Sequence, residues 1–363
     1  MRPTYLEVNL PQLKKNLEAI SAHVTAAKVM PMIKANAYGH GVDGVAPYME
    51  PYVDAFGVAI VEEAVHLRQM GIRKPILVAG GILPEQIPLF VEYDLTLTAS
   101  SPELLAAAES VAQSAGIKIT AHLKIDTGME RVGVHYYESD SFLEQSLRCK
   151  HVLIEGIYTH FANSEDPKLT HARQQLERFQ EVLRFYEKHS LPFPIRHMAN
   201  SGAILQFPES HMDLVRPGLM FYGVYPVGVE HTVELAPALS WKSRVAYSKM
   251  TRPGHPVSYG SLWQPESETR IVTIPCGYAD GYFRRMTNQA QAIINGRKYP
   301  QVGRICMDQF MVDAGNDRVE VGDEVVLLGD DITAYDLAAW TGTNEYEVLT
   351  NISARVPRRY IEE

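Results

Sequence analysis

A lysine stands at the end of one short apolar stretch of the sequence. Residues 29–33 are mostly apolar and predict a buried strand that leads directly into Lys34. Asn36, Gly39 and Gly41 follow, and they predict that the strand gives way to a loop just after the lysine. Burying an ammonium group is costly unless the group is paired or loses its proton, so a buried Lys34 would be suited to amine chemistry. A lysine whose amine simply reaches water is the common alternative.

Lysine, arginine and histidine side chains recur at the ends of later strand-like segments. Taken alone, each is more often a solvated surface group than a ligand contact. If one architecture brought these strand ends together, the residues would surround a single cationic opening that binds an anion. The residues are His122, Lys124, Arg131, His160, Arg196, His197 and Arg216.

Two glycine-containing turns have the composition of a phosphate site. They are residues 200–202, which include Ser201, and residues 217–219, which include Gly218 and Leu219. A serine hydroxyl and the backbone N–H groups of such turns bind phosphate, and barrels often carry this site after their last two strands. A glycine after a proline is also an ordinary turn, so the pattern alone is only moderately specific.

The last third of the chain carries a second group of polar residues on glycine-rich turns. Tyr259 lies within Ser-Tyr-Gly, Tyr278 lies in the glycine- and tyrosine-rich residues 277–282, and Met307 ends a strand-like segment. A tyrosine in such a loop more often packs its ring and leaves its hydroxyl in water.

The elements that must position these residues alternate regularly between strands and helices. Such alternation predicts parallel strands with crossover helices, and its length favours a (β/α)8 barrel over an open sheet. In these barrels the functional residues lie at the carboxyl ends of the strands, where Lys34 stands. The predicted strands are residues 29–33, 55–60, 75–79, 95–99, 117–125, 153–159, 194–198 and 214–222.

The pattern changes after about residue 235. Prolines interrupt it, and short alternating segments separated by glycines predict a mainly antiparallel β domain. We therefore expect a barrel over residues 10–235 and a β-rich domain over residues 236–363. The predicted strand at residues 1–9 is a candidate to pack on the second domain.

Composition excludes several classes of protein. The chain has 363 residues, a formal net charge of -9 and 46% hydrophobic residues, which is ordinary for a globular protein and unlike a nucleic-acid binder. No apolar run predicts a signal peptide or a membrane span. The three widely spaced cysteines predict neither a metal site nor a disulfide framework, so we expect a reduced, cytoplasmic protein.

These motifs together resemble the fold-type III, pyridoxal-5'-phosphate-dependent alanine racemases. The resemblance runs almost end to end, and many separate motifs in the family's order make it specific. The matching segments are residues 30–41, 124–133, 158–161, 199–202, 215–223, 257–260, 275–281, 302–308, 344–348 and 355–359.

The resemblance implies the two residues that carry the reaction and the two that face the cofactor ring. Lys34 would bind pyridoxal 5'-phosphate covalently and would act as one base. Tyr259, supplied by a second subunit, would be the opposing base. Arg216 would face the pyridine nitrogen and His160 would lie against the ring.

The resemblance also implies the binding residues. Tyr38, Ser201, Gly218, Leu219 and Tyr346 would hold the cofactor phosphate. Arg131 and the backbone at Met307 would receive the substrate carboxylate, and Tyr278 of the partner subunit would line the substrate entry. Lys124 matches a lysine that is often carbamylated in this family and then pairs with the arginine at Arg131.

One residue departs from the family pattern. The family usually has glycine where this chain has Glu130. A carboxylate beside Arg131 would compete for the guanidinium and would repel a carbamate on Lys124.

The expected function is therefore interconversion of L-alanine and D-alanine by a cytoplasmic homodimer with shared active sites. It would supply D-alanine for peptidoglycan, through two acid–base groups on opposite faces of the substrate. The alternatives are a basic-amino-acid decarboxylase of the same fold type, a cofactor-binding protein without turnover, a serine racemase and a broad-specificity periplasmic racemase. The sequence leaves open the choice between alanine and serine and between a biosynthetic and a catabolic role.

Overall fold

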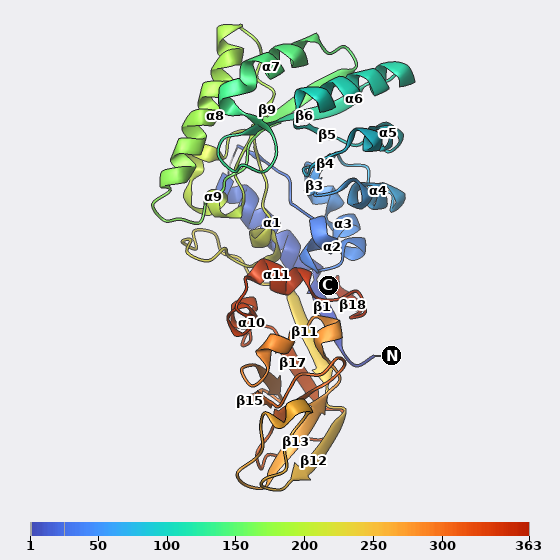
Figure 1. The fold of residues 1–363 in the computed structure, drawn as a ribbon, viewed down its shortest axis with the longest axis vertical. Coiled ribbons are helices and arrows are strands. Elements are labelled where there is room, and N and C mark those ends of the chain that lie inside the picture. Colours follow the sequence, from blue (N-terminus) through green and yellow to red (C-terminus); the bar gives the residue numbers. More distant parts are fainter. Residues whose placement is uncertain (1, 25, 363) are drawn as a thin grey trace. The chain divides into compact units, whose positions relative to one another are not determined.

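Parallel strands form a closed ring in the N-terminal part of the chain. The computed structural model of the protein describes residues 2–24 and 26–362 (Figure 1). Neighbouring strands pair in parallel: β3 pairs with β4, and Gly57 of β3 forms a parallel bridge with Met32, which follows β2. The ring closes where β10 pairs with β2 and where the Asp213 N–H donates to the Arg196 carbonyl over 3.1 Å. Its strands are β2 (Lys28–Val29), β3 (Phe56–Val58), β4 (Ile76–Val78), β5 (Leu97–Ala99), β6 (Ile119–Asp126), β8 (Val152–Tyr158), β9 (Ile195–His197) and β10 (Leu214–Val215).

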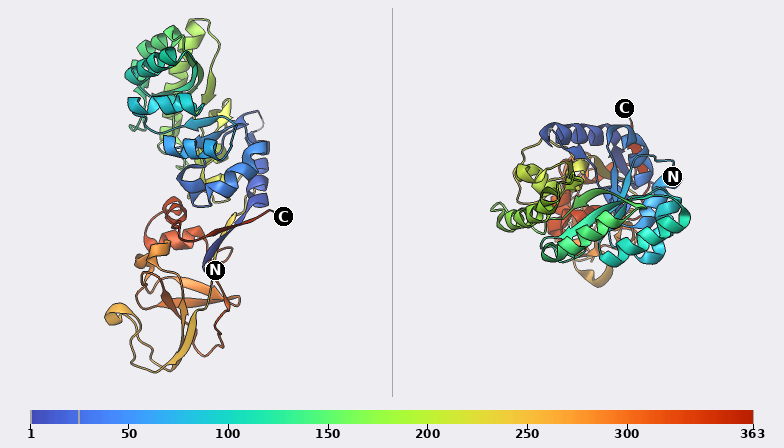
Figure 2. Two further views of the ribbon diagram at one scale, coloured as in Figure 1. Left: turned by 90° about the vertical axis from the view of Figure 1, so that its right-hand side faces the viewer. Right: turned by 90° about the horizontal axis from the view of Figure 1, so that it is seen from above.

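Helices lie around the outside of this ring (Figure 2). In α8 (Thr170–Lys188), Leu176, Phe179 and Leu183 recur at helical spacing and are buried, and each such side chain contributes about 1.5–3 kcal/mol. The other helices of this part are α1 (Leu10–Val24), α3 (Val42–Met49), α4 (Val61–Gln69), α5 (Ile87–Glu92), α6 (Pro102–Ala115), α7 (Ser139–Arg148) and α9 (Ser201–Gln206), with the short strand β7 (Val134–His135) beside β6.

The C-terminal part is built on a mainly antiparallel sheet. Its strand order is β12-β13-β16-β15-β14-β17-β11-β1-β18, in which β1 runs antiparallel to β11 and parallel to β18. Its elements are β1 (Tyr5–Asn9), β11 (Leu239–Arg244), β12 (Tyr247–Thr251), β13 (Thr269–Ile274), β14 (Gln291–Ile294), β15 (Arg297–Val302), β16 (Phe310–Asp313), β17 (Glu324–Leu328), β18 (Arg358–Ile361), α10 (Ala334–Thr341) and α11 (Glu345–Thr350).

The core of this sheet is aromatic. The Tyr282 ring stacks on Phe310 with centroids 4.5 Å apart and meets the edge of Trp241, and all three side chains are fully buried. The fold class predicted from the sequence, a (β/α)8 barrel followed by a mainly antiparallel β domain, is confirmed.

The described chain divides into two units that interleave in sequence. The C-terminal unit comprises residues 2–12, 38–41 and 237–362, and the barrel unit comprises residues 13–24, 26–37 and 42–236. Lys34 therefore belongs to the barrel, whereas Tyr38, four residues later, belongs to the other unit. Of the helices that the structure describes, none has the length and apolarity that crossing a bilayer requires.

Candidate active site

Lys34 opens a left-handed turn at the carboxyl end of its strand segment. The sequence predicted a loop here, but α2 (Lys34–Tyr38) has left-handed backbone angles, with φ of 52° at Ala35, 55° at Asn36 and 52° at Ala37. Left-handed geometry costs roughly 1–2 kcal/mol for each residue that is not glycine. Such a segment persists only when its surroundings hold it.

Two side chains of the barrel hold this turn. The Ala35 N–H donates to Oε1 of Glu63 over 2.6 Å, and the other oxygen of Glu63 accepts the Ala59 N–H over 2.8 Å. The side-chain oxygen of Asn36 accepts the Val42 N–H over 2.8 Å. The backbone immediately after Lys34 is therefore held by two side-chain acceptors, one of which, Glu63, lies on α4.

The surroundings of Lys34 favour its neutral amine. Burial lowers the pKa of Lys34, the nearby Arg131 cation lowers it further, and the Glu63 carboxylate acts in the opposite direction. A neutral amine is the form that attacks a carbonyl or removes a proton.

Arg216 is buried at the end of β10 among neutral acceptors. Its guanidinium donates to His197 Nδ1 over 2.8 Å, to the Thr159 carbonyl over 2.9 Å and to the Met198 carbonyl over 3.2 Å, and it lies 3.2 Å from His160 Nδ1. Burial lowers the pKa of Arg216 to about 10, which leaves the group charged at neutral pH. The charge of Arg216, added to burial, holds the pKa of His160 well below its usual value, so that imidazole is neutral.

Lys124 is a buried amine on β6. Its nitrogen lies 4.8 Å from the centre of the Tyr158 ring, and the structure gives it one long hydrogen bond, 3.5 Å, to the Ile125 carbonyl. Burial first, and the Arg216 charge second, hold the pKa of Lys124 well below the usual lysine value. The lowered pKa favours the neutral, nucleophilic form of this amine.

Glu130, the departure from the family pattern, lies in the turn after β6. The Asp126 carboxylate accepts the N–H groups of Gly128, Met129 and Arg131 over 2.7, 3.0 and 3.2 Å. Glu130 has a φ of 52°, in the left-handed region that favours glycine, and its carboxylate lies 3.0 Å from His135 Nε2. The competition with Arg131 suggested by the sequence is therefore not the contact that forms, because Glu130 is turned toward His135.

The two turns predicted to bind phosphate lie together. Ser201, the first residue of α9, is buried, and its hydroxyl accepts the Gly218 N–H over 2.9 Å and the Met220 N–H over 3.4 Å. Gly218 precedes the short helical turn that begins at Leu219. Backbone N–H groups and a hydroxyl thus converge at the ends of β9 and β10.

Tyr38 and Tyr346, both assigned by the resemblance to the phosphate, meet in the C-terminal unit. Their ring centroids are 6.1 Å apart. Gly39 permits this approach, because a Cβ at its position would come within 2.1 Å of the Leu349 carbonyl oxygen on α11. A side chain at residue 39 would therefore separate the loop of Tyr38 from the helix that carries Tyr346.

Tyr259 is exposed and follows a strained residue. Its side chain is 71% exposed, and Ser258 before it has φ 68° and ψ −176°, a region populated almost exclusively by glycine. The Ser258 hydroxyl donates to the Arg304 carbonyl over 2.6 Å and contacts Cys306 Sγ at 3.3 Å. The strained residue therefore directly precedes an exposed tyrosine.

Tyr278 and Met307 are held beside each other by backbone hydrogen bonds. The Tyr278 N–H donates to the Cys306 carbonyl over 3.1 Å, and the Ala279 N–H donates to the Met307 carbonyl over 3.0 Å. Both side chains are exposed, Tyr278 by 42% and Met307 by 52%. They form, with Tyr259, a group of large exposed side chains on the C-terminal unit.

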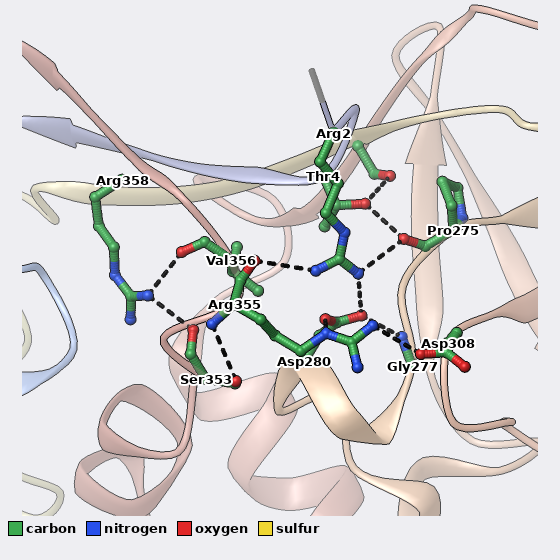
Figure 3. A network of polar contacts seen from close by, with 11 residues as sticks. Arg2, Thr4, Pro275, Gly277, Asp280, Asp308, Ser353, Arg355, Val356 and Arg358 are labelled. Carbon is green, nitrogen blue, oxygen red and sulfur yellow. Dashed lines mark hydrogen bonds and ion pairs between the residues drawn. The ribbon is translucent and has the colours of Figure 1, made fainter.

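The buried carboxylate of Asp280 supports the segments that carry Tyr278 and Met307 (Figure 3). Asp280 is fully buried, pairs with Arg2 over 2.6 Å and with Arg355 over 3.0 Å, and accepts the Gly277 N–H over 3.0 Å. Arg355 also pairs with Asp308 over 2.7 Å. The turn that bears Tyr278 is therefore tied to both ends of the described chain.

The structure brings the assigned residues together in two groups. The barrel unit gathers Lys34, Lys124, Arg131, His160, Ser201, Arg216, Gly218 and Leu219, and the C-terminal unit carries Tyr38, Tyr259, Tyr278, Met307 and Tyr346. Sequence reasoning missed Glu63 and Asp280. Each carboxylate accepts a backbone N–H within a short helical turn, a pattern too common in sequences to single out a site.

Comparison with known proteins gives matches over both units. The family model described as "Alanine racemase, N-terminal domain" matches residues 8–226, and "Alanine racemase, C-terminal domain" matches residues 238–360. A curated alanine racemase from Carboxydothermus hydrogenoformans is 43% identical over 369 residues, covering 99% of this chain and 100% of that protein.

Solved structures match over the whole chain as well. The alanine racemase of Clostridium difficile 630 has a TM-score of 0.95 and 36% identity, with 100% of this chain and 96% of that chain covered. The alanine racemase of Bartonella henselae with covalently bound pyridoxal phosphate has a TM-score of 0.91 and 28% identity. The match covers 99% of this chain and 100% of that chain.

Proposed function

The chain belongs to the alanine racemase family, and on that premise we propose that it interconverts L-alanine and D-alanine with pyridoxal 5'-phosphate as its cofactor. The observation that carries the proposal is the environment of Lys34, whose pKa is lowered by burial and by Arg131, in the same unit as a buried Arg216 that contacts neutral acceptors. The relatives named alanine racemase over their full length support the choice of alanine as substrate.

The residues present fit this cofactor. The lowered pKa of the Lys34 amine suits covalent attachment to an aldehyde, and the N–H groups and hydroxyl near Ser201 and Gly218 suit a phosphate. Lys34 would hold the cofactor covalently, Arg216 its pyridine nitrogen and His160 its ring. Its phosphate would be held by Tyr38, Ser201, Gly218, Leu219 and Tyr346.

When bound, the cofactor draws electrons from the substrate α-carbon and so makes the α-proton acidic. Arg216 keeps its own protons and would leave the pyridine nitrogen unprotonated, which would limit that electron withdrawal. Side reactions that need stronger withdrawal, such as transamination, are thereby disfavoured.

Two groups of the protein move the proton. Racemisation requires that a proton leave one face of the α-carbon and that another arrive on the opposite face. The Lys34 amine serves one face and the Tyr259 hydroxyl serves the other. Tyr259 comes from a partner subunit, so the active form is a homodimer with shared sites, and its 71% exposure supports this assignment.

The remaining assignments concern the substrate. Arg131 and the backbone at Met307 bind its carboxylate, and Tyr278 of the partner subunit lines the entry. Lys124 is carbamylated and pairs with Arg131, an assignment supported by the lowered pKa of its buried amine and by the turning of Glu130 toward His135. The bulk of Tyr278, Met307 and Tyr346 favours a small side chain, alanine before serine.

The product D-alanine serves peptidoglycan synthesis, and the enzyme acts in the cytoplasm. The three free cysteines support a reducing compartment.

The test is isotope exchange. The purified protein is incubated with pyridoxal phosphate and L-alanine in deuterated water, and α-deuterium and D-alanine are followed together. We expect both to appear, and a Tyr259→Phe variant to lose D-alanine formation while its Lys34 still binds the cofactor. Exchange without inversion would overturn the two-base assignment.

A parallel set of assays separates the alternatives. Serine in place of alanine reports the substrate preference, and carbon dioxide release from lysine or arginine reports a decarboxylase. A protein that turns yellow with the cofactor but exchanges no α-proton would be a binding protein, and the proposal would fail.

A further inference from the structure

A continuous line of side-chain hydrogen bonds crosses the barrel unit and ends at Arg216. Arg216 contacts His197 Nδ1 at 2.8 Å, His197 Nε2 contacts His122 Nδ1 at 2.8 Å, and His122 Nε2 contacts Glu155 Oε2 at 3.3 Å. His197 is fully buried, and His122 is 4% exposed. Neither His122 nor Glu155 has a role in the reaction described above.

Arg216 and Glu155, at the two ends of this line, determine which ring nitrogens of His197 and His122 carry a proton. A guanidinium has only donors, so His197 Nδ1 accepts from Arg216 and its proton is on Nε2. That N–H donates to His122 Nδ1, which places the His122 proton on Nε2, and this N–H donates to the Glu155 carboxylate. Burial and the Arg216 charge hold the pKa of His197 well below its usual value, consistent with a neutral ring.

The backbone is adapted to this arrangement. In the pairing of β6 with β8, Ala121 faces Ile154 whereas His122 faces Gly156, so Glu155 is an extra residue in a bulge. A Cβ at Gly156 would come within 2.5 Å of His122 Nδ1, so glycine at this position makes room for the His122 ring. The side chain of Glu155 is 42% exposed, and it reaches His122 from the edge of the interior.

A stacked tyrosine holds the inner half of the line. The Tyr158 ring lies parallel to His197 with centroids 4.6 Å apart, and its hydroxyl is 2.9 Å from the Thr98 hydroxyl. His197 therefore cannot tilt toward another acceptor without losing this contact. Its Nε2 proton depends on His122 for its partner.

We propose that His122, anchored by Glu155, is a positioning residue that fixes the tautomer of His197 and thereby the guanidinium of Arg216. The proposal rests on the proposed function for its catalytic consequence, since it is Arg216 that would face the pyridine nitrogen. Without His122 as acceptor, the His197 N–H is buried and unpaired. Moving that proton to Nδ1 would point an N–H at the Arg216 donors, so either state loosens Arg216.

The primary test reads the histidine protons directly in the cofactor-free protein. Long-range proton–nitrogen spectra of protein labelled with 15N-histidine distinguish a ring nitrogen that carries hydrogen from one that does not. We expect His197 to be protonated only on Nε2 in the natural protein. In His122→Phe, which keeps a ring over Gly156 but removes the acceptor, we expect His197 to populate the other tautomer.

Substitutions of Glu155 test the anchor without altering the interior. Glu155→Gln keeps an oxygen that accepts the His122 N–H, so the tautomers are retained, whereas Glu155→Leu removes it and lets the His122 proton redistribute. Glu109→Gln is the matched control, because it alters another histidine–glutamate pair of the barrel, His151 with Glu109 at 2.9 Å. The control is expected to leave the His197 signals unchanged.

Kinetics in the cofactor-loaded enzyme give a second readout. In His122→Phe we expect kcat to fall about tenfold with KM changed less than about twofold, because Arg216 is misplaced while the substrate contacts remain. A His197 tautomer that is unchanged in both His122→Phe and Glu155→Leu would overturn the proposal. If His122→Phe fails to fold, Glu155→Leu decides alone, because its side chain is partly exposed.

The spectra test the positioning role of His122 independently of the racemase assay, which tests the proposed function. If the natural protein does not racemise alanine but the His197 tautomer responds to His122 as expected, the proposed function fails and the positioning role stands. If racemisation is observed and the tautomer does not respond, the positioning role fails alone.

Discussion

The carboxylate of Glu63 accepts the N–H of Ala35 over 2.6 Å, one residue after Lys34. The same carboxylate accepts the N–H of Ala59 at the end of β3 over 2.8 Å, so one side chain joins two successive strand ends of the barrel. It also raises the pKa of Lys34, against the larger lowering by burial and by Arg131. Glu63 therefore influences both the backbone and the charge state of the lysine.

Glu63→Ala is expected to destabilise the protein by about 1–2 kcal/mol, because the backbone N–H groups of Ala35, Ala59 and Ile60 lose their acceptor. Glu63→Gln keeps one carbonyl acceptor, so its free energy of unfolding should lie between those of Glu63→Ala and the natural protein. Urea unfolding measures the effect. Glu62→Ala, on the neighbouring residue of α4, is the matched control, and an equal loss in that variant would contradict the assigned role of Glu63.

The pKa of Lys34 can be measured from its reactivity in cofactor-free protein. Only the neutral amine is labelled by an acylating reagent, so a lowered pKa moves the rise in labelling of Lys34 below the usual lysine value of 10.5. Arg131→Met should move that rise part of the way back, since burial remains. Arg131→Lys keeps the charge and should not. Mass spectrometry of the labelled peptide measures labelling of Lys34 as a function of pH. Identical profiles for Arg131→Met and Arg131→Lys would show that the charge of Arg131 does not affect the pKa of Lys34.

Glu130→Gly is expected to stabilise the protein by about 1 kcal/mol at alkaline pH, because Glu130 occupies left-handed backbone geometry at φ 52°. Glu130→Ala removes the carboxylate without relieving the backbone and serves as the control. A stabilisation by Ala equal to that by Gly would rule out backbone strain as the cause.

The gain from Glu130→Gly should depend on pH. Glu130 raises the pKa of His135 above its usual 6.5. Stabilisation from this pair is complete below that value and is lost as pH rises through the higher pKa of the folded protein. The gain should therefore be smaller near pH 5 than near pH 9, as measured by unfolding at both values.

Ser258→Gly is expected to separate stability from activity. Glycine adopts the backbone angles of Ser258 without strain, which offsets the lost hydrogen bond to the Arg304 carbonyl and leaves stability unchanged or up by about 1 kcal/mol. Tyr259 then loses its fixed direction, so kcat should fall about tenfold. Ser258→Ala keeps the strain, loses the hydrogen bond and should be less stable by about 1 kcal/mol. Thermal unfolding and racemase assays of both variants test this, and full activity in Ser258→Gly would contradict it.

Asp280→Ala is expected to cost about 3 kcal/mol, because its fully buried carboxylate pairs with Arg2 and Arg355. Arg355→Met should cost less, since that side chain is 43% exposed and Arg2 still pairs with the carboxylate. A double-mutant cycle of the two substitutions, measured by urea unfolding, gives their coupling. A coupling near zero would mean that the Asp280–Arg355 contact adds nothing to stability.

Much of the architecture follows from local sequence pattern. Apolar segments of the right length alternate with amphipathic ones, as in α8, and that periodicity alone indicates parallel strands with crossover helices. The change to short alternating segments near residue 235 predicts a sheet of the other kind for the same reason. The short strands β12, β15, β16 and β18 have weak patterns of their own and are defined by the strands beside them.

By itself, the sequence determined which chemical groups the barrel offers and that they stand at strand ends, because residue type and strand order are local properties. Only the tertiary structure decided the left-handed turn at Ala35, the direction of Glu130 toward His135 and the line from Glu155 to Arg216. Each of these depends on backbone angles or on partners distant along the chain. A hydrogen bond between His122 and His197 has no sequence signature, since it forms only when β6 and β9 are set on either side of β8.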